Sequence, residues 1–258
     1  MVSQSANMQA GCSFQLSNNE VHIWTMPTEA SDAVVVQFER VLSEDEAKRA
    51  ARFRFSHLRD SFVITRGVLR HLLGRYLSLE PARLCFSYGD KGKPAVASEG
   101  NLASEGNLQF NLTHSGGIAA VAFTTGCQLG IDAEHIRPVK EMQQIADRNF
   151  SAEEATELMR LPESEREPAF FRCWTRKEAY IKAIGDGLSC ALDSFQVTLL
   201  PNMPPRLIHI GGDSVAAEMW SLHDLCVAPD YASALAYRDR ERSVSIFPVS
   251  DLAELADS

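Results

Sequence analysis

The sequence lacks the features that mark membrane, secreted and nucleic-acid-binding proteins. No window approaches the roughly 18 consecutive apolar residues of a membrane span, and the N-terminus lacks the basic-then-apolar layout of a signal peptide. The six cysteines are scattered without a Cys-x-x-Cys pair, so neither a zinc site nor a disulfide framework is indicated. The formal net charge of −9 argues against nucleic acid as a partner. We therefore expect a cytoplasmic protein with no membrane and no nucleic-acid partner.

The charge is unevenly distributed along an otherwise ordinary globular composition. With 45% hydrophobic and 23% charged residues, the 258-residue chain can bury a sizeable core as one large domain or two smaller ones. Residues 48–75, however, contain eight Lys or Arg residues and the single acid Asp60. This basic segment is consistent either with the solvated faces of helices or with an anion site for phosphates or an acidic partner.

The order of predicted elements occurs twice along the chain. Ser43 and Ser151 each open a capping box, with Glu three residues later, and the two serines lie 108 residues apart (151 − 43). Strand-like runs that end at Phe123 and Tyr237 lie 114 residues apart (237 − 123). Chance recurrence of common elements is the alternative explanation. A duplication predicts two similar halves related by a pseudo-twofold axis, with the active site in the cleft between them.

The periodicity of apolar residues predicts an α+β fold in each half. Helices are expected to run from about Ser43 toward Phe53, from about Ser61 to Tyr76, and over 168–184. The short runs FNLTHS, IAAVAF and QLGIDAE predict strands of an antiparallel meander. Each half is therefore expected to be a small antiparallel sheet packed with helices.

The expected domain boundaries follow from this pattern. They are a flexible lead (1–18), an N-terminal half (19–125), a C-terminal half (126–240) and a C-terminal tail (241–258). The hexapeptide ASEGNL occurs in tandem at 97–102 and 103–108, and its composition is typical of a loop insertion without chemistry of its own.

A pair of carboxylates closes one of the predicted strands. Because side chains alternate between the faces of a strand, Asp132 and Glu134 should point to the same side, roughly 6 to 7 Å apart at the backbone. A hard cation would relieve their repulsion, and magnesium suits one or two carboxylates with water and phosphate in its other positions. An exposed strand end with two acids is the alternative.

The helix expected over 168–184 carries two further candidates. Helical spacing puts Trp174 on the buried stripe, with Lys177 on one shoulder and Glu178 and Lys182 on the other. Glu178 then borders the core, where it would complete a metal site or take a proton. A surface Glu–Lys pair at i, i+4 is the alternative.

Two segments supply phosphate-binding candidates. Lys93 lies in the short basic turn KGKP, where Gly92 allows the backbone to approach a ligand closely. Thr113 and His114 end a strand with hydroxyl and imidazole groups before two glycines. His114 taken alone is more typical of a hydrogen-bonded structural residue.

Taken together, these segments resemble the 4′-phosphopantetheinyl transferases of the surfactin-synthetase-activating type. The family's ordered signatures are a Gly-Lys-Pro turn, an Asn-x-Ser/Thr-His-Ser strand, a Gly-Ile-Asp-x-Glu strand and a Trp-Ser/Thr-x-Lys-Glu-Ala-x-x-Lys helix. All four occur here in that order, at residues 92–94, 111–115, 130–134 and 174–182. With the upstream pattern at 52–70, the resemblance covers roughly residues 20 to 240.

The resemblance implies transfer of the phosphopantetheine arm of coenzyme A to a serine of an apo acyl or peptidyl carrier protein, with release of adenosine 3′,5′-bisphosphate. It also implies the two-halved fold. By position, magnesium would be held by Asp132, Glu134 and Glu178. The phosphates of coenzyme A would be held by Arg49, Arg66, Lys93, Thr113, His114 and Lys182. The position of Arg49 is the least fixed, since Lys48 or Arg52 would also serve.

The chemistry of the transfer assigns roles to two residues of the helix. Glu178 is the expected base for the carrier serine, directly or through a water on the metal, and Lys182 is expected to protonate the leaving phosphate. The chain is expected to be a monomer. The alternatives are a non-catalytic module that binds coenzyme A or a carrier, and a different magnesium-dependent nucleotide enzyme. The glycine-rich phosphate loop of the latter class is absent from the sequence.

Overall fold

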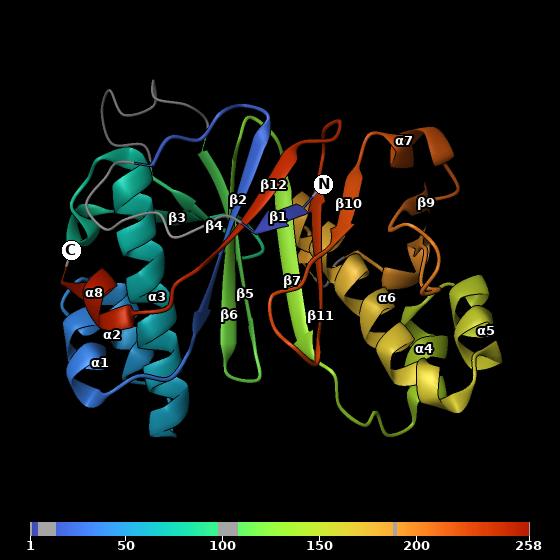
Figure 1. Cartoon of the computed structure of the whole chain (residues 1–258), viewed down its shortest axis with the longest axis horizontal. Coiled ribbons are helices and arrows are strands. Elements are labelled where there is room, and N and C mark those ends of the chain that lie inside the picture. The colour runs from blue at the N-terminus through green and yellow to red at the C-terminus, as the bar shows by residue number, and fades with distance from the viewer. Residues whose placement is uncertain (1, 5–13, 98–107, 188–189, 258) are drawn as a thin grey trace. The chain divides into compact units, whose positions relative to one another are not determined.

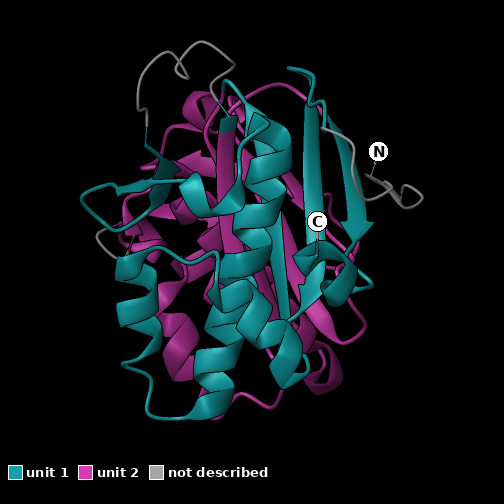
Figure 2. Ribbon diagram, turned by 90° about the vertical axis from the view of Figure 1, so that its left-hand side faces the viewer, with its two compact units in different colours: residues 1–108, 117–126, 243–258 teal, residues 109–116, 127–242 magenta. Residues whose placement is uncertain are grey.

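The computed structural model describes residues 2–4, 14–97, 108–187 and 190–257, which divide into two compact units. Figure 2 colours them separately: unit 1 comprises residues 1–108, 117–126 and 243–258, and unit 2 comprises residues 109–116 and 127–242. Each unit combines helices with small sheets, which confirms the predicted α+β class. The pseudo-twofold relation and the cleft stay predictions.

Unit 1 is built around strand β2 (Glu20–Pro27), which has a neighbour on each side (Figure 1). Strand β6 (Ile118–Thr125) pairs with it antiparallel, and β12 (Ser243–Pro248) pairs with it parallel. Strand β1 (Val2–Gln4) adds to β12, also parallel. The other elements are α1 (Asp32–Glu39), α2 (Glu44–Ala50), α3 (Ser56–Leu77), the 3₁₀ turn η1 (Pro81–Arg83), the hairpin β3 (Phe86–Tyr88) with β4 (Pro94–Val96), and α8 (Leu252–Ala256).

Unit 2 is built around strand β7 (Leu129–His135) and the helix α6 (Glu163–Ile184), which packs against it. Its antiparallel sheet has the order β10-β11-β7, where β10 is Ser221–Asp224 and β11 is Tyr231–Tyr237. The other elements are β5 (Leu108–Ser115), α4 (Met142–Asn149), α5 (Ala152–Arg160), η4 (Leu192–Ser194), the hairpin β8 (Phe195–Val197) with β9 (Leu207–Ile210), and α7 (Ser214–Glu218).

The two units repeat one order of elements. In each, a strand leads to three helices, a 3₁₀ turn and a short hairpin, and the leading strand pairs antiparallel with a later one, β2 with β6 and β7 with β11. The third helix has 22 residues in both units, and α6 begins 107 residues after α3 (163 − 56). Both helices end at a left-handed residue, Ser78 and Gly185. The repeat predicted from the capping boxes is therefore present in the elements themselves.

Each capping-box glutamate is buried and binds a cation on that long helix. Glu46 accepts the backbone N–H of Ser43 and lies 2.6 Å from Nε of Arg70 on α3. Glu154 accepts the N–H of Ser151 and lies 2.7 Å from Nζ of Lys177 on α6. The same residue thus caps the second helix and anchors it to the third.

Several details differ from the predictions. Residues 241–258, expected to form a tail, contain β12 and α8, so unit 1 gains a parallel strand that its predicted antiparallel sheet did not include. The expected meander does not continue from β6 to β7, because these consecutive strands pair with β2 and β11 respectively. Of the expected flexible lead, residues 5–13 lie outside the described residues, as does most of the ASEGNL repeat.

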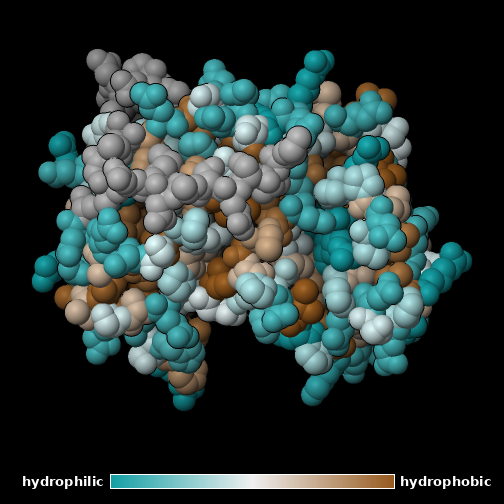
Figure 3. Space-filling view, viewed as in Figure 1, coloured by the Kyte–Doolittle hydropathy of each residue, from teal (hydrophilic) through white to brown (hydrophobic). Residues whose placement is uncertain are grey.

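On the face in Figure 3, hydrophobic residues occur in small groups among hydrophilic ones. Within the described ranges, no helix is both long and apolar enough to span a membrane.

Candidate active site

A pocket of about 330 Å³ in unit 2 gathers six of the predicted site residues. Its walls come from the end of β5, from β7 and from α6. The lining residues are Leu112, Thr113, His114, Asp132, Glu134, Trp174, Glu178 and Lys182. Three carboxylates and one ammonium group thus share a small polar space.

Gly130 allows β7 and α6 to approach closely enough to form this pocket. A Cβ atom at position 130 would overlap the carbonyl oxygen of Ala179 and the backbone nitrogen of Ala183. These two alanines are the chain neighbours of Glu178 and Lys182. The absence of a side chain on the strand therefore brings the two helix residues to the carboxylates of the same strand.

Asp132 is buried and only partly neutralised. Its Oδ1 accepts hydrogen bonds from Nζ of Lys182 at 2.6 Å and from the hydroxyl of Thr113 at 3.1 Å, whereas its Oδ2 has no hydrogen-bond partner among the described residues. Burial raises the pKa of this carboxyl, and the nearby Lys182 opposes that shift. One buried carboxylate oxygen is therefore available for a further ligand.

Glu134 lies further out on the same face of β7. The hydroxyl of Ser115 donates to its Oε2 at 2.7 Å, and Nη1 of Arg137 lies 3.4 Å from the same oxygen. Arg137 is exposed, so this ion pair contributes little to stability.

Glu178 faces the two strand carboxylates from α6. Burial raises the pKa of its carboxyl, and the negative charges of Asp132 and Glu134 raise it further against the opposing effect of Lys182. A carboxyl whose pKa is raised in this way is suited to accept a proton near neutral pH.

The pocket also has a basic and an aromatic side. Nζ of Lys182 donates to Thr113 at 3.2 Å as well as to Asp132. His114 is exposed at the mouth, and Trp174 stacks on Phe170 with ring centroids 5.9 Å apart. Trp174 is the link between the pocket and the core of unit 2.

The remaining predicted cations lie in unit 1. Arg66 is buried, donates to the hydroxyl of Tyr88 at 3.1 Å and lies over the ring of Phe86. Arg49 is exposed and lies 5.2 Å from the centroid of Phe62. The β3–β4 hairpin pairs Tyr88 with Pro94, next to Lys93, whose pKa burial lowers to about 8. Arg66 is thus bound to the hairpin that carries Lys93.

One predicted placement on α6 differs in the structure. Lys177, expected on one shoulder of the buried stripe, is fully buried and binds Glu154. The ammonium group of Lys177 also donates to the carbonyls of Leu192 and Phe195, so all three of its hydrogens have an acceptor. Asn111 and Ser115, which belong to the strand motif but had no predicted role, contact β7. Their alternation with Thr113 along the strand puts the three side chains on one side.

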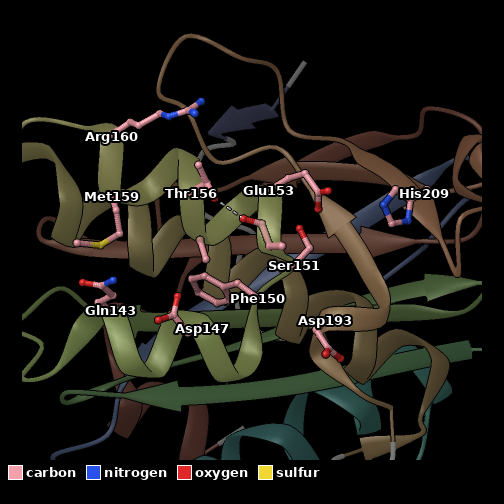
Figure 4. A pocket seen from close by; sticks show the side chains of 12 residues that line it. Gln143, Asp147, Phe150, Ser151, Glu153, Thr156, Met159, Arg160, Asp193 and His209 are labelled. Carbon is pink, nitrogen blue, oxygen red and sulfur yellow. Dashed lines mark hydrogen bonds between the residues drawn. The ribbon is translucent and has the colours of Figure 1, made fainter.

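A larger cavity of about 890 Å³ lies elsewhere in unit 2 and contains none of the predicted site residues. Figure 4 shows side chains of α4 and α5 around it, with Asp193 and His209 on the other side. Most of these side chains are exposed, as expected for a shallow surface groove.

The donor set of the smaller pocket suits a hard cation. In the described part of the chain, no group of three or more His, Cys, Asp or Glu residues is arranged closely enough to hold a metal ion. The three acidic side chains of the pocket nevertheless offer carboxylate oxygens to a cation, and the unpartnered Oδ2 of Asp132 is buried there. Magnesium prefers oxygen ligands of this kind, with substrate phosphate completing its shell.

Comparison with known proteins identifies the family. The model of the 4′-phosphopantetheinyl transferase superfamily matches residues 128–236, and that of the 4′-phosphopantetheinyl transferase N-terminal region matches residues 26–126. The 4′-phosphopantetheinyl transferase HetI of Nostoc sp. is 37% identical over 221 residues, which cover 86% of this chain and 89% of that protein. The transferase Sfp of Bacillus subtilis is 29% identical, covering 79% and 88%.

Solved structures give a weaker likeness. The holo-[acyl-carrier-protein] synthase of Thermotoga maritima aligns with 43% of this chain and 62% of its own, at 20% identity and a TM-score of 0.35.

The chain belongs to the 4′-phosphopantetheinyl transferase family. This confirms the predicted family and the predicted reaction, transfer of the phosphopantetheine arm of coenzyme A to a carrier protein.

Proposed function

We propose that the pocket formed by β5, β7 and α6 is where the transfer takes place, with magnesium bound by Asp132, Glu134 and Glu178. The observation that carries this proposal is the convergence of those carboxylates with Lys182 in one space of about 330 Å³. Phosphoryl transfer needs charge neutralisation and alignment above all, and this pocket offers both kinds of charge.

The cations hold coenzyme A by its phosphates. Arg49, Arg66 and Lys93 of unit 1, together with Lys182 of unit 2, provide the positive charge, and His114 adds a hydrogen-bonding imidazole. Arg66 suits this role because its guanidinium is held by Tyr88 and Phe86, so little side-chain freedom is lost when it binds an anion.

In the proposed step, the hydroxyl oxygen of the carrier serine bonds to the phosphorus of the phosphopantetheine phosphate. The bond from that phosphorus to the oxygen bridging the two phosphates breaks, and adenosine 3′,5′-bisphosphate leaves with the electron pair. Glu178 takes the serine proton, and its raised pKa favours this role. Lys182 meets the charge that develops on the leaving phosphate and supplies a proton to it.

When bound, magnesium would supply neutralisation of the pyrophosphate charge at the carboxylates. The unpartnered oxygen of Asp132 and the pKa-raising repulsion among the three acids support a cation at this place. We further propose that the enzyme works in the cytoplasm on apo acyl or peptidyl carrier proteins.

The reaction is tested by incubating the protein with coenzyme A, magnesium and a panel of apo carrier proteins. Intact mass should show a gain of roughly 340 Da on one serine of a carrier, the mass of the added arm. Omission of magnesium should abolish the gain. Coenzyme A binding without any carrier gain would support a non-catalytic module instead.

Replacement of Glu178 by Gln tests the site. The change keeps the shape of the side chain and removes its charge and basicity, so turnover should fall by at least about a hundredfold. The thermal unfolding midpoint should stay near that of the wild type. Full activity of Glu178→Gln would refute the role assigned to this residue.

A further inference from the structure

The open edge of β7 is bonded to side chains of β5 where a sheet would use backbone carbonyls. Strand β7 pairs with β11 on one side (Figure 1). The backbone N–H groups of Ile131, Ala133 and His135 are bonded to side chains of β5 instead. Their acceptors are Oδ1 of Asn111 at 2.9 Å, Oγ1 of Thr113 at 3.3 Å and Oγ of Ser115 at 3.4 Å. The two-residue period of both strands matches these partners one to one.

The two hydroxyls of this side-chain ladder also bind the carboxylates of β7. Thr113 donates to Asp132 at 3.1 Å, and Ser115 donates to Glu134 at 2.7 Å. Each hydroxyl therefore accepts from the backbone of β7 and donates to the carboxylate one residue earlier. The backbone bond fixes the oxygen, so the hydrogen is directed at one particular carboxylate oxygen.

The bonding capacity of Thr113 is fully used in this arrangement. A hydroxyl has one hydrogen to donate and two lone pairs to accept with. The hydrogen goes to Asp132, and the lone pairs accept from Ala133 and from Lys182 at 3.2 Å. Thr113 is also buried, with 4% of its surface exposed. Its hydroxyl therefore joins the backbone of β7, a carboxylate and an ammonium group at one point.

We propose that Thr113 and Ser115 are positioning residues, which hold Asp132 and Glu134 in the orientation needed for catalysis through the bonds they make to β7. The phosphate contact predicted for Thr113 from sequence stays a prediction, and the kinetics of Thr113→Val distinguish it from positioning. The catalytic consequence rests on the proposed function of the pocket, whereas the ladder itself is a property of the folded chain.

Amide hydrogen exchange tests the ladder without reference to activity. In Thr113→Val, which has nearly the same shape without the hydroxyl, the Ala133 amide should exchange at least about fivefold faster, as expected for loss of one hydrogen bond. The Ile131 amide, bonded to Asn111, should be unchanged, and Thr113→Ser should restore the protection of Ala133. Equal exchange of Ala133 in wild type and Thr113→Val would overturn the proposal.

Steady-state kinetics test the consequence. We expect kcat of Thr113→Val to fall by at least about tenfold, with KM for coenzyme A within about twofold, because a misdirected Asp132 affects the transition state more than coenzyme A binding. Thr113→Ser should recover most of kcat, and Ser115→Ala and Ser115→Thr should form a second such pair. A rise in KM alone would assign Thr113 to phosphate binding and refute the positioning role.

A matched control separates these effects from loss of a buried threonine hydroxyl in general. Thr124 is fully buried on β6 and donates to the carbonyl of Glu20 at 2.8 Å, so Thr124→Val should leave kcat near wild type. A loss of kcat in Thr124→Val equal to that in Thr113→Val would remove the evidence for positioning. If the wild-type protein modifies no carrier but the Ala133 amide is protected as expected, the proposed function is refuted and the side-chain ladder is still supported.

Discussion

At the residue scale, the site depends on one missing side chain. Gly130 lets α6 lie against β7, and the two residues it faces are neighbours of Glu178 and Lys182. The glycine that opens the Gly-Ile-Asp-x-Glu signature is thus required by packing, and the packing in turn sets the distance between the helix and strand groups.

Gly130→Ala should therefore reduce both stability and turnover. We expect about 1–3 kcal/mol of lost stability from overpacking, and a fall in kcat of tenfold or more as the helix moves away. Denaturant unfolding and carrier modification measure the two effects. Gly89→Ala is the stability control, because its new Cβ meets its nearest atom, the carbonyl oxygen of Lys93, at 3.8 Å. Equal stability of the two variants would contradict the packing argument.

Lys93 gives the enzyme a pH dependence of its own. Since burial lowers its pKa to about 8, the amine is charged below that pH and becomes neutral as the pH rises through it. Its attraction for a phosphate of coenzyme A should fade in the same range. Lys93→Arg stays charged. We expect kcat/KM for coenzyme A of the wild type, divided by that of Lys93→Arg, to fall as the pH rises from 7 to 9. A ratio that does not change with pH would exclude Lys93 from phosphate binding.

The residue types of the site could be predicted from sequence, but their partners could not. Alternation along a strand sufficed to put Asp132 and Glu134 on one side, and the pocket contains both. Lys177 was expected only on a shoulder of the buried stripe, because helical periodicity does not show that Glu154 of another helix neutralises it in the core. A partner so distant in sequence leaves no local signal.

At the element scale, buried ion pairs attach the helices to one another. In unit 2, Glu154 binds Ser151, Lys177 and the backbone N–H of Val197, so α5, α6 and β8 meet at one carboxylate. Lys177 directly precedes Glu178, and this ion pair therefore also fixes the rotation of α6 about its axis.

Lys177→Met should be strongly destabilising because it leaves the Glu154 carboxylate buried without its cation. We expect a loss of about 3–5 kcal/mol in the free energy of unfolding, measured with denaturant. Lys48→Met removes an exposed i, i+4 pair with Glu44 and should change stability by less than about 0.5 kcal/mol. Similar losses in the two variants would show that burial does not set the strength of the pair.

Element boundaries were the least predictable part of the fold. Helix α6 begins at Glu163, five residues before the predicted start at Pro168. The prediction took the proline as a helix start, since proline has no backbone N–H to donate. In the structure Pro168 lies inside the helix instead. Strand β12 could not be predicted from the duplication, since unit 2 has no counterpart of it after β11.

At the scale of the whole molecule, the repeated order of elements indicates that one ancestral half was used twice and then specialised. Unit 2 carries the carboxylates, and unit 1 carries Arg49, Arg66 and Lys93. Both units have a buried capping glutamate. The glutamates therefore serve the fold, whereas the charged residues found in one unit alone serve the proposed chemistry.

The duplication also leads us to predict a monomer. A chain that contains both halves has no need of a second copy to supply the missing one. Sedimentation equilibrium at micromolar concentration should return the mass of one chain, 28.5 kDa. An obligate dimer would contradict this prediction, and the control is the same measurement with coenzyme A present.

The chain passes between the two units four times, at residues 108–109, 116–117, 126–127 and 242–243. A gene cut at the midpoint of the duplication would therefore not yield two independent half-proteins. A fragment of residues 126–240 would lack β5 and therefore the three side-chain acceptors. Three backbone N–H groups of β7 would then form an unpaired sheet edge that can pair with another chain. The ancestral half cannot be recovered by truncation; it would have to be rebuilt by adding to this fragment a strand that takes the place of β5.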